Sequence, residues 1–111
     1  MAEFILRYPL EITRMQKIKL PRGAKILNIE VIDDQPEKPE ITPNIYLIVQ
    51  AEQDIQHYSR INKDTENRIF LTYGVGSVIE KTGKLLTYVG CYSLTFRMSK
   101  TKSFYVYEQN A

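Results

Sequence analysis

The sequence predicts an all-β protein of about seven mainly antiparallel strands, packed as a compact sandwich or an open barrel with little helix. Short runs that alternate apolar and polar residues, or that are rich in β-branched and aromatic residues, recur along the chain. No stretch of convincing length places apolar residues at helical spacing. Because one flat sheet could not bury both apolar faces, two packed layers or a barrel are expected.

The first strands follow from period-two patterns. Residues 3–8 (EFILRY) are strand formers and are expected to end at Pro9, because proline does not fit the interior of a sheet. Residues 14–20 alternate strictly, which predicts that Lys17 and Lys19 face water while Ile18 and Leu20 face inward. A turn at Pro21, Arg22 and Gly23 precedes a β-branched run at 24–32, so the two runs are interpreted as a β-hairpin.

The rest of the chain continues this pattern. Residues 33–44 contain three prolines and four acids (DDQPEKPEITPN), which predicts an exposed loop. A nearly continuous apolar run follows (NIYLIVQA, 44–51) and predicts a central strand covered on both faces. The polar segment 52–67 suits a short helical turn or a loop, with Ile55, Tyr58 and Ile61 at spacings of three. Further strands are expected at 68–74, 84–96 and 102–108, the last with Phe104 and Val106 opposite Tyr105 and Tyr107.

Length and charge limit the functional classes. The 111 residues form one domain, 1–111, and the net charge of +2 is too small for a general nucleic-acid or membrane binder. No stretch approaches the length of a membrane span, so we expect a soluble protein without a membrane partner. A single cysteine, Cys91, excludes an internal disulfide and fits a reducing compartment.

Motifs for catalysis, metals or cofactors are weak. The phrase YGVGSVIEKTG lacks the third glycine and the following helix of a dinucleotide site, so Gly74, Gly76, Gly83 and also Gly90 are interpreted as turn or bulge positions. His57 is the only histidine, in a polar connector. Cys91 is expected to be a small buried hydrophobe. The sequence therefore predicts no enzyme, no metal site and no cofactor.

The clearest charge feature is a run of cations without an acid, Arg14, Lys17, Lys19, Arg22 and Lys25. Exposed positions of a hairpin explain it, because an antiparallel sheet often has one wet face. Binding of a nucleotide or nucleic acid is the alternative, since cations neutralise phosphates and aromatic rings stack on bases. In that alternative, Lys17, Lys19 and Arg22 are the candidate phosphate-binding residues.

Several motifs in order resemble a family of short proteins of unknown function encoded by bacteriophages and prophages. They are YPLEI at Tyr8–Ile12, LPRGAKIL at Leu20–Leu27, YGVG at Tyr73–Gly76, and YVG at Tyr88–Gly90 before the aromatic strand Phe104–Glu108. The resemblance covers most of the chain. Departures are a valine in the glycine turn, where the family pattern has threonine, and the acidic loop and polar connector, which look like additions.

The resemblance implies a phage accessory protein in the cytoplasm of a bacterial host. Such a protein is expected to bind and inhibit a host or anti-phage defence protein stoichiometrically, because variable loops on a β scaffold suit recognition. A small virion component is a further alternative, and the closing strand also suits a homodimer. The residues predicted to contact the partner are Arg22 and Lys25 in the turn, Asp33, Asp34, Glu37 and Glu40 in the acidic loop, and Tyr105 and Tyr107 in the closing strand.

Overall fold

The computed structural model describes residues 2–33, 43–53, 64–79, 83–96 and 100–110. Over these residues the chain forms seven strands and no helix, which confirms the predicted all-β class. The strands are β1 (Ala2–Leu10), β2 (Met15–Pro21), β3 (Lys25–Ile32), β4 (Asn44–Gln53), β5 (Thr65–Gly74), β6 (Leu86–Phe96) and β7 (Lys100–Gln109).

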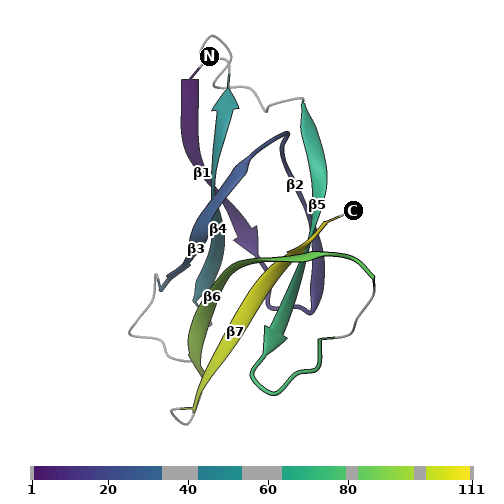
Figure 1. Ribbon diagram of the computed structural model, residues 1–111. Coiled ribbons are helices and arrows are strands. Elements are labelled where there is room, and N and C mark those ends of the chain that lie inside the picture. Colours follow the sequence, from purple (N-terminus) through teal and green to yellow (C-terminus); the bar gives the residue numbers. More distant parts are fainter. Residues whose placement is uncertain (1, 34–42, 54–63, 80–82, 97–99, 111) are drawn as a thin grey trace.

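The strands form two antiparallel sheets. Sheet A has the order β1-β4-β3, and sheet B has the order β2-β5-β7-β6 (Figure 1). The Cα trace measures 49 × 42 × 16 Å, and the short dimension fits two sheets packed about 10 Å apart. The sheets do not close into a barrel, so of the two predicted arrangements the sandwich is the observed one.

The predicted hairpin between residues 14–20 and 24–32 is wrong. The turn at Pro21–Gly23 exists, with the Ala24 amide donating to the Pro21 carbonyl at 3.0 Å and Gly23 at a φ of 75°. However, β2 pairs with β5 in sheet B and β3 pairs with β4 in sheet A. Both strands turn apolar side chains inward, and Leu20 and Ala24 are buried on either side of the turn. The turn therefore carries the chain across the sandwich.

Two other strand predictions have different outcomes. The first strand does not end at Pro9 but continues to Leu10, with Pro9 opposite Tyr46. This continuation is allowed because β1 is an edge strand, where one side of the backbone needs no partner. The apolar run 44–51 is confirmed as a central strand, because β4 lies between β1 and β3 and buries both Leu47 and Ile48, whose side chains point to opposite faces.

The hydrophobic core lies between the two sheets. Sheet A contributes alternate residues of β4, and sheet B contributes alternate residues of each of its strands. The alternation predicted for β2 and β7 is confirmed, since Leu20 and Val106 are fully buried while Lys17 and Lys19 are exposed. The buried cluster consists of Leu10, Leu20, Ala24, Ile45, Leu47, Val49, Ala51, Phe70, Tyr92, Leu94 and Val106.

The expectation that Cys91 is buried is wrong, because its side chain is exposed. The register between β6 and β7 shifts between Tyr88 and Gly90, and such a bulge reverses which residues face outward. Tyr88 and Cys91, three residues apart, therefore both point away from the core. Gly90 faces the other sheet, because a Cβ at this position would lie 3.4 Å from Cδ1 of Ile29 in β3.

Two of the glycines predicted to lie in turns are Gly76, in the YGVG motif, and Gly83, in the segment that follows it. Gly76 and Gly83 have φ values of 89° and 78°, which confirms them as turn positions. Most of the acidic loop (residues 34–42) and of the polar connector (residues 54–63, with Ile55, His57, Tyr58 and Ile61) lies outside the described residues.

Tyr92 provides a test of the core. Its ring stacks on Phe104 with 5.2 Å between centroids, and its hydroxyl has no hydrogen-bond partner among the described residues. Burial raises the pKa of Tyr92, because the charged phenolate is unfavourable in the core. The stability that the neutral side chain contributes is therefore complete below about pH 10 and is lost as pH rises through the folded-state pKa.

We expect Tyr92→Phe to leave the free energy of unfolding at pH 7 unchanged or about 1 kcal/mol higher. Above about pH 10 the variant should lose less of its free energy of unfolding than the natural chain does. Urea unfolding at both pH values measures this. A large loss of stability at pH 7 would contradict it.

Candidate functional site

The outward side chains of sheet B form a continuous apolar and aromatic surface. Met15, Leu71, Tyr107 and Tyr88 lie opposite one another in a row that crosses all four strands. Tyr73 pairs with Tyr105 in the adjacent row. We call this surface the tyrosine face; it consists of Met15, Leu71, Tyr73, Tyr88, Tyr105 and Tyr107.

The rings of the tyrosine face hold one another in place. Tyr107 packs edge to face against Tyr73 and Tyr88, with centroid distances of 6.0 and 5.5 Å. Such pairs stabilise the ring arrangement beyond their buried area. The surface is accessible at Tyr88, Tyr105 and Met15, which are 52%, 38% and 63% exposed, whereas Leu71 and Tyr73 are buried. The neighbouring Cys91 side chain is the main cause of the raised pKa of Tyr88.

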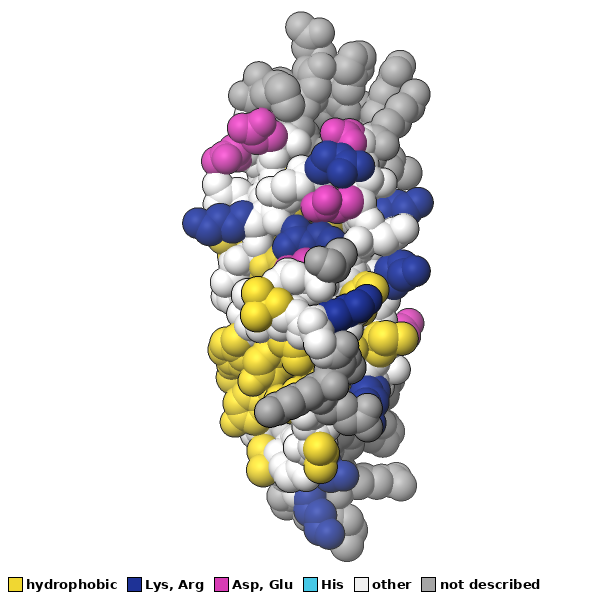
Figure 2. All heavy atoms as spheres, turned by 45° about the vertical axis from the view of Figure 1, so that its right-hand side comes forward, with side chains coloured by type: hydrophobic (Ala, Val, Ile, Leu, Met, Phe, Trp, Pro, Cys, Tyr) yellow, Lys and Arg dark blue, Asp and Glu magenta, His cyan; other side chains and the backbone are white. Residues whose placement is uncertain are grey.

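The charges around the tyrosine face are positive. Arg14 lies over the ring of Tyr73, with its Cζ atom 6.0 Å from the ring centroid. Lys17 and Lys19 are exposed on β2, the strand at one edge of the face. Among the described residues, the acids of β5 and β7, Glu66 and Glu108, have the opposite parity and belong to the inner side of sheet B. In Figure 2, hydrophobic side chains gather in the lower half of the visible face, and basic and acidic side chains lie next to one another above them.

The outer face of sheet A differs in composition. There Gln50 donates to Glu3 at 2.6 Å, and Arg7 lies 4.7 Å from the ring centroid of Tyr46. Ile5 is 71% exposed on this face, between polar and charged residues. The two outer faces therefore offer different surfaces: sheet B carries the tyrosine face, with Lys17 and Lys19 at its edge, and sheet A carries a mixture of acidic, amide and basic side chains.

The predicted contact residues are divided between several places. Tyr105 and Tyr107 lie on the tyrosine face, as do Lys17 and Lys19 at its edge. Lys25, at the start of β3, and Asp33, after its end, are exposed and belong to the sheet A side of the molecule. Asp34, Glu37 and Glu40 lie outside the described residues.

Arg22 of the predicted phosphate site has acidic partners of its own, Asp64 and Glu66. Its Nε atom donates to Asp64 at 3.0 Å, and its Nη1 atom lies 3.7 Å from Glu66. The hydrogen bond with Asp64 is the main cause of the raised pKa of Arg22. Of the three candidate phosphate-binding residues, Lys17 and Lys19 therefore lie together, and Arg22 holds the turn to the start of β5.

A second charged cluster lies at the same end of the sandwich. Arg68 forms a two-pronged ion pair with Glu108, in which Nη2 donates to Oε1 at 2.8 Å, and it also donates to the Ala24 carbonyl. The side chains of Arg68 and Glu108 are only 17% and 14% exposed. These contacts join β5, β7 and the turn that crosses between the sheets. The cluster is therefore interpreted as structural.

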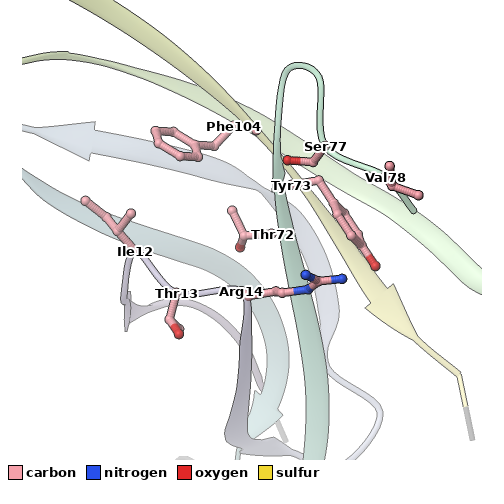
Figure 3. A pocket seen from close by; sticks show the side chains of 9 residues that line it. Ile12, Thr13, Arg14, Thr72, Tyr73, Ser77, Val78 and Phe104 are labelled. Carbon is pink, nitrogen blue, oxygen red and sulfur yellow. The ribbon is translucent and has the colours of Figure 1, made fainter. Parts of the chain in front are cut away.

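A pocket of about 350 Å³ lies where the pairing of β2 with β5 ends (Figure 3). The Thr72 amide donates to the Arg14 carbonyl at 2.9 Å, which is the last contact of this edge. Beyond it the chain turns away on both sides, which leaves a hollow beside Tyr73 at the end of the tyrosine face. The pocket is lined by Ile12, Thr13, Arg14, Thr72, Tyr73, Gly74, Ser77, Val78 and Phe104.

Sequence reasoning missed much of this site. Tyr105 and Tyr107 were predicted to contact a partner together, because side chains two positions apart on one strand lie on the same face. Met15, Leu71, Tyr73 and Tyr88 join them only through strand pairing, which no local pattern indicates.

Among the described residues no cluster of three His, Cys, Asp or Glu side chains could hold a metal. The described part of the chain also contains no helix that is long and apolar enough to span a membrane. The chemistry offered by the tyrosine face is apolar, aromatic and cationic contact.

Comparison with known proteins gives a family but no function. No curated protein and no solved structure matches the chain. One family profile matches all of residues 1–111. The chain therefore belongs to the family described as Domain of unknown function (DUF7352).

Proposed function

We propose that this chain is a non-enzymatic binding protein that engages a protein partner through the tyrosine face of sheet B. The observation that supports the proposal is the row of Met15, Leu71, Tyr107 and Tyr88 across four strands, with exposed aromatic and methionine side chains at its surface. Aromatic residues, methionine and arginine are enriched in the centres of protein interfaces. An apolar patch with a polar rim on a folded protein is typical of an interaction site.

The charge around the face indicates the chemistry of the partner. Arg14, Lys17 and Lys19 border the face, and the described acids of the neighbouring strands point inward. A partner with an apolar centre and an acidic rim would complement this arrangement, and opposite charges would accelerate its association. The resemblance to phage and prophage proteins supports a host or anti-phage defence protein as that partner, with inhibition as the result of binding.

Binding of a single-stranded nucleic acid is the second candidate function. It is favoured by the position of Lys17 and Lys19 on the same face as exposed Tyr88 and Tyr105, since basic groups bind phosphates while aromatic rings stack on bases. The two functions differ in salt dependence. A nucleic-acid complex that neutralises several phosphates weakens steeply with salt, whereas an interface with an apolar centre is retained.

The proposal is tested by affinity capture of the tagged full chain from bacterial lysate, with and without nuclease, at about 0.1 and 0.5 M salt. We expect one protein to be retained at near-stoichiometric yield under all four conditions. Its purified form should then be titrated against the tagged chain by calorimetry. Retention of nucleic acid alone, lost with nuclease or salt, would replace this proposal with the second candidate function.

A further inference from the structure

We propose that the edge of sheet B formed by β6 pairs with the same edge of a second copy of this chain, so that two sandwiches share one continuous sheet. This inference goes beyond the proposed function and does not depend on it, because it concerns the backbone edge of the sheet and not the tyrosine face. The homodimer expected through the closing strand is not available by strand pairing, since β7 lies between β5 and β6 (Figure 1). The edge strands of sheet B are β2 and β6.

The β6 edge lacks the residues that keep an edge strand from pairing with another chain. An edge strand presents a row of backbone groups without a partner strand, and charged residues or prolines on it discourage pairing. The 11 residues of β6, Leu86–Phe96, include no charged residue and no proline. The other edges of the two described sheets all carry such residues: Lys17, Lys19 and Pro21 on β2, Glu3, Arg7 and Pro9 on β1, and Lys25 and Glu30 on β3.

The second half of β6 offers a regular surface for pairing. The register with β7 shifts between Tyr88 and Gly90, so a bulge interrupts the first half of the strand. From Gly90 to Phe96 the register with β7 is continuous. Within this segment the side chains alternate between the exposed outer face, with Cys91, Ser93 and Thr95, and the buried inner face, with Tyr92 and Leu94.

A two-fold axis through Ser93 uses the whole of this regular segment. An axis perpendicular to the sheet preserves its two faces, so outer residues pair with outer residues and inner with inner. Cys91 then lies opposite Thr95 of the second copy, and Tyr92 lies opposite Leu94. Small side chains therefore meet on the outer face, and apolar side chains meet on the inner face.

Charge selects a second copy through β6 and not through the other edge of sheet B. Like charges directly opposite one another destabilise a strand pair. Self-pairing of β2 would bring the lysines of two copies together, whereas self-pairing of β6 opposes no charges. The outer face of β6 already forms a cross-strand hydroxyl pair, in which the Oγ atoms of Ser93 and Ser103 are 2.8 Å apart. The two-fold axis would extend this row of hydroxyls into the second copy.

The neighbouring edge of sheet A would add apolar contacts. A Cβ at Gly90 of β6 would lie 3.4 Å from Ile29 of β3, so these two edge strands form one rim of the sandwich. On β3, Leu27 and Val31 are 39% and 38% exposed. A second sandwich joined at β6 would place its own rim beside these side chains and cover them.

Association is tested by sedimentation equilibrium of the full chain in reducing buffer, from about 1 to about 300 µM. One strand and its rim make a small interface, so we expect a monomer–dimer equilibrium with a micromolar dissociation constant. Ser93→Lys should weaken dimerisation at least tenfold, because it opposes like charges at the axis. The matched control Ser103→Lys makes the same change on the same face of the adjacent strand and should alter it less than twofold. A monomer at every concentration, or equal effects of the two variants, would overturn the proposal.

Disulfide trapping tests the register. In a Cys91→Ser background, Ser93→Cys places two thiols opposite each other at the axis, where Cα atoms lie about 4.5 to 5.5 Å apart, within reach of a disulfide. The control Ser103→Cys would hold its thiols about 14 Å apart, which is three strand spacings. Mild oxidation should give a covalent dimer from position 93 and little from position 103. Comparable yields would contradict the proposed pairing. Failure of either experiment would leave the capture experiment on the tyrosine face unaffected.

Discussion

Arg68→Met is expected to lower the free energy of unfolding by about 3 kcal/mol, because it leaves Glu108 charged and largely buried without its partner. The reverse change, Glu108→Leu, should cost a similar amount. Arginine stays charged at any ordinary pH, so in the Glu108→Leu variant the guanidinium cannot lose its charge to relieve the burial. Arg68→Met leaves the Glu108 carboxylate without its partner, and Glu108→Leu leaves the Arg68 guanidinium with only Glu66, at 4.0 Å.

The double variant Arg68→Met with Glu108→Leu distinguishes a lost ion pair from lost packing. Apolar residues of similar volume can replace a buried pair at little cost, so its stability should lie within about 1 kcal/mol of the natural chain. The Ala24 carbonyl loses one donor in this variant, which sets the remaining cost. Unfolding of the natural chain, the two single variants and the double variant by guanidinium chloride gives the coupling energy of the pair through a double-mutant cycle. If the double variant loses the sum of the single losses, the pair is not coupled as the structure indicates.

The double variant Tyr88→Thr with Tyr105→Thr is expected to weaken binding of the captured partner at least 100-fold. Both side chains are exposed, at 52% and 38%, and loss of an aromatic group from the centre of an interface commonly costs more than about 2 kcal/mol. Threonine keeps a strand-forming side chain, so the fold should be retained. Calorimetry with the purified partner measures the affinity.

The matched control for this variant is Ile5→Thr on the outer face of sheet A. Ile5 is 71% exposed and is also a large apolar residue on a strand. Its replacement should change partner affinity less than twofold. Thermal unfolding of both variants verifies that they are folded. Equal losses of affinity from the two faces would indicate a general effect on the protein rather than a site on sheet B.

The strands could be predicted from the sequence because each depends on local patterns. The period of two in β2 and β7 and the apolar run of β4 determine which side chains face inward, whatever the partner strand. Proline at position 9 was misread, since an edge strand tolerates it and the edge position depends on distant pairing. The strands were therefore predictable as elements but not as neighbours.

The hairpin error shows the same limit at the level of topology. Two alternating runs separated by Pro21–Gly23 look alike whether the second strand pairs with the first or crosses to another sheet. The crossing is determined by β5 and β4, which come later in the chain and pair with β2 and β3. The exposure of Cys91 had a related cause, because the bulge between Tyr88 and Gly90 appears only in the register of β6 with β7.

The candidate site was predictable only in part for the same reason. Tyr105 and Tyr107 share a face by local geometry, and the cations on β2 were visible in the sequence. Their combination with Met15, Leu71 and Tyr88 requires the register of three strand pairs. The pocket likewise joins residues 12–14, 72–78 and 104, which no motif connects.

The most direct test of the tyrosine face as a protein-binding surface is site-specific photocrosslinking in bacterial cells. A photoreactive phenylalanine analogue is placed at Tyr105 in one variant and at Ile5 in another, and adducts are identified by mass spectrometry. We predict one predominant protein adduct from position 105, identical to the captured partner, and little or none from position 5. Adducts from position 5 but not from position 105 would contradict the assignment of binding to sheet B.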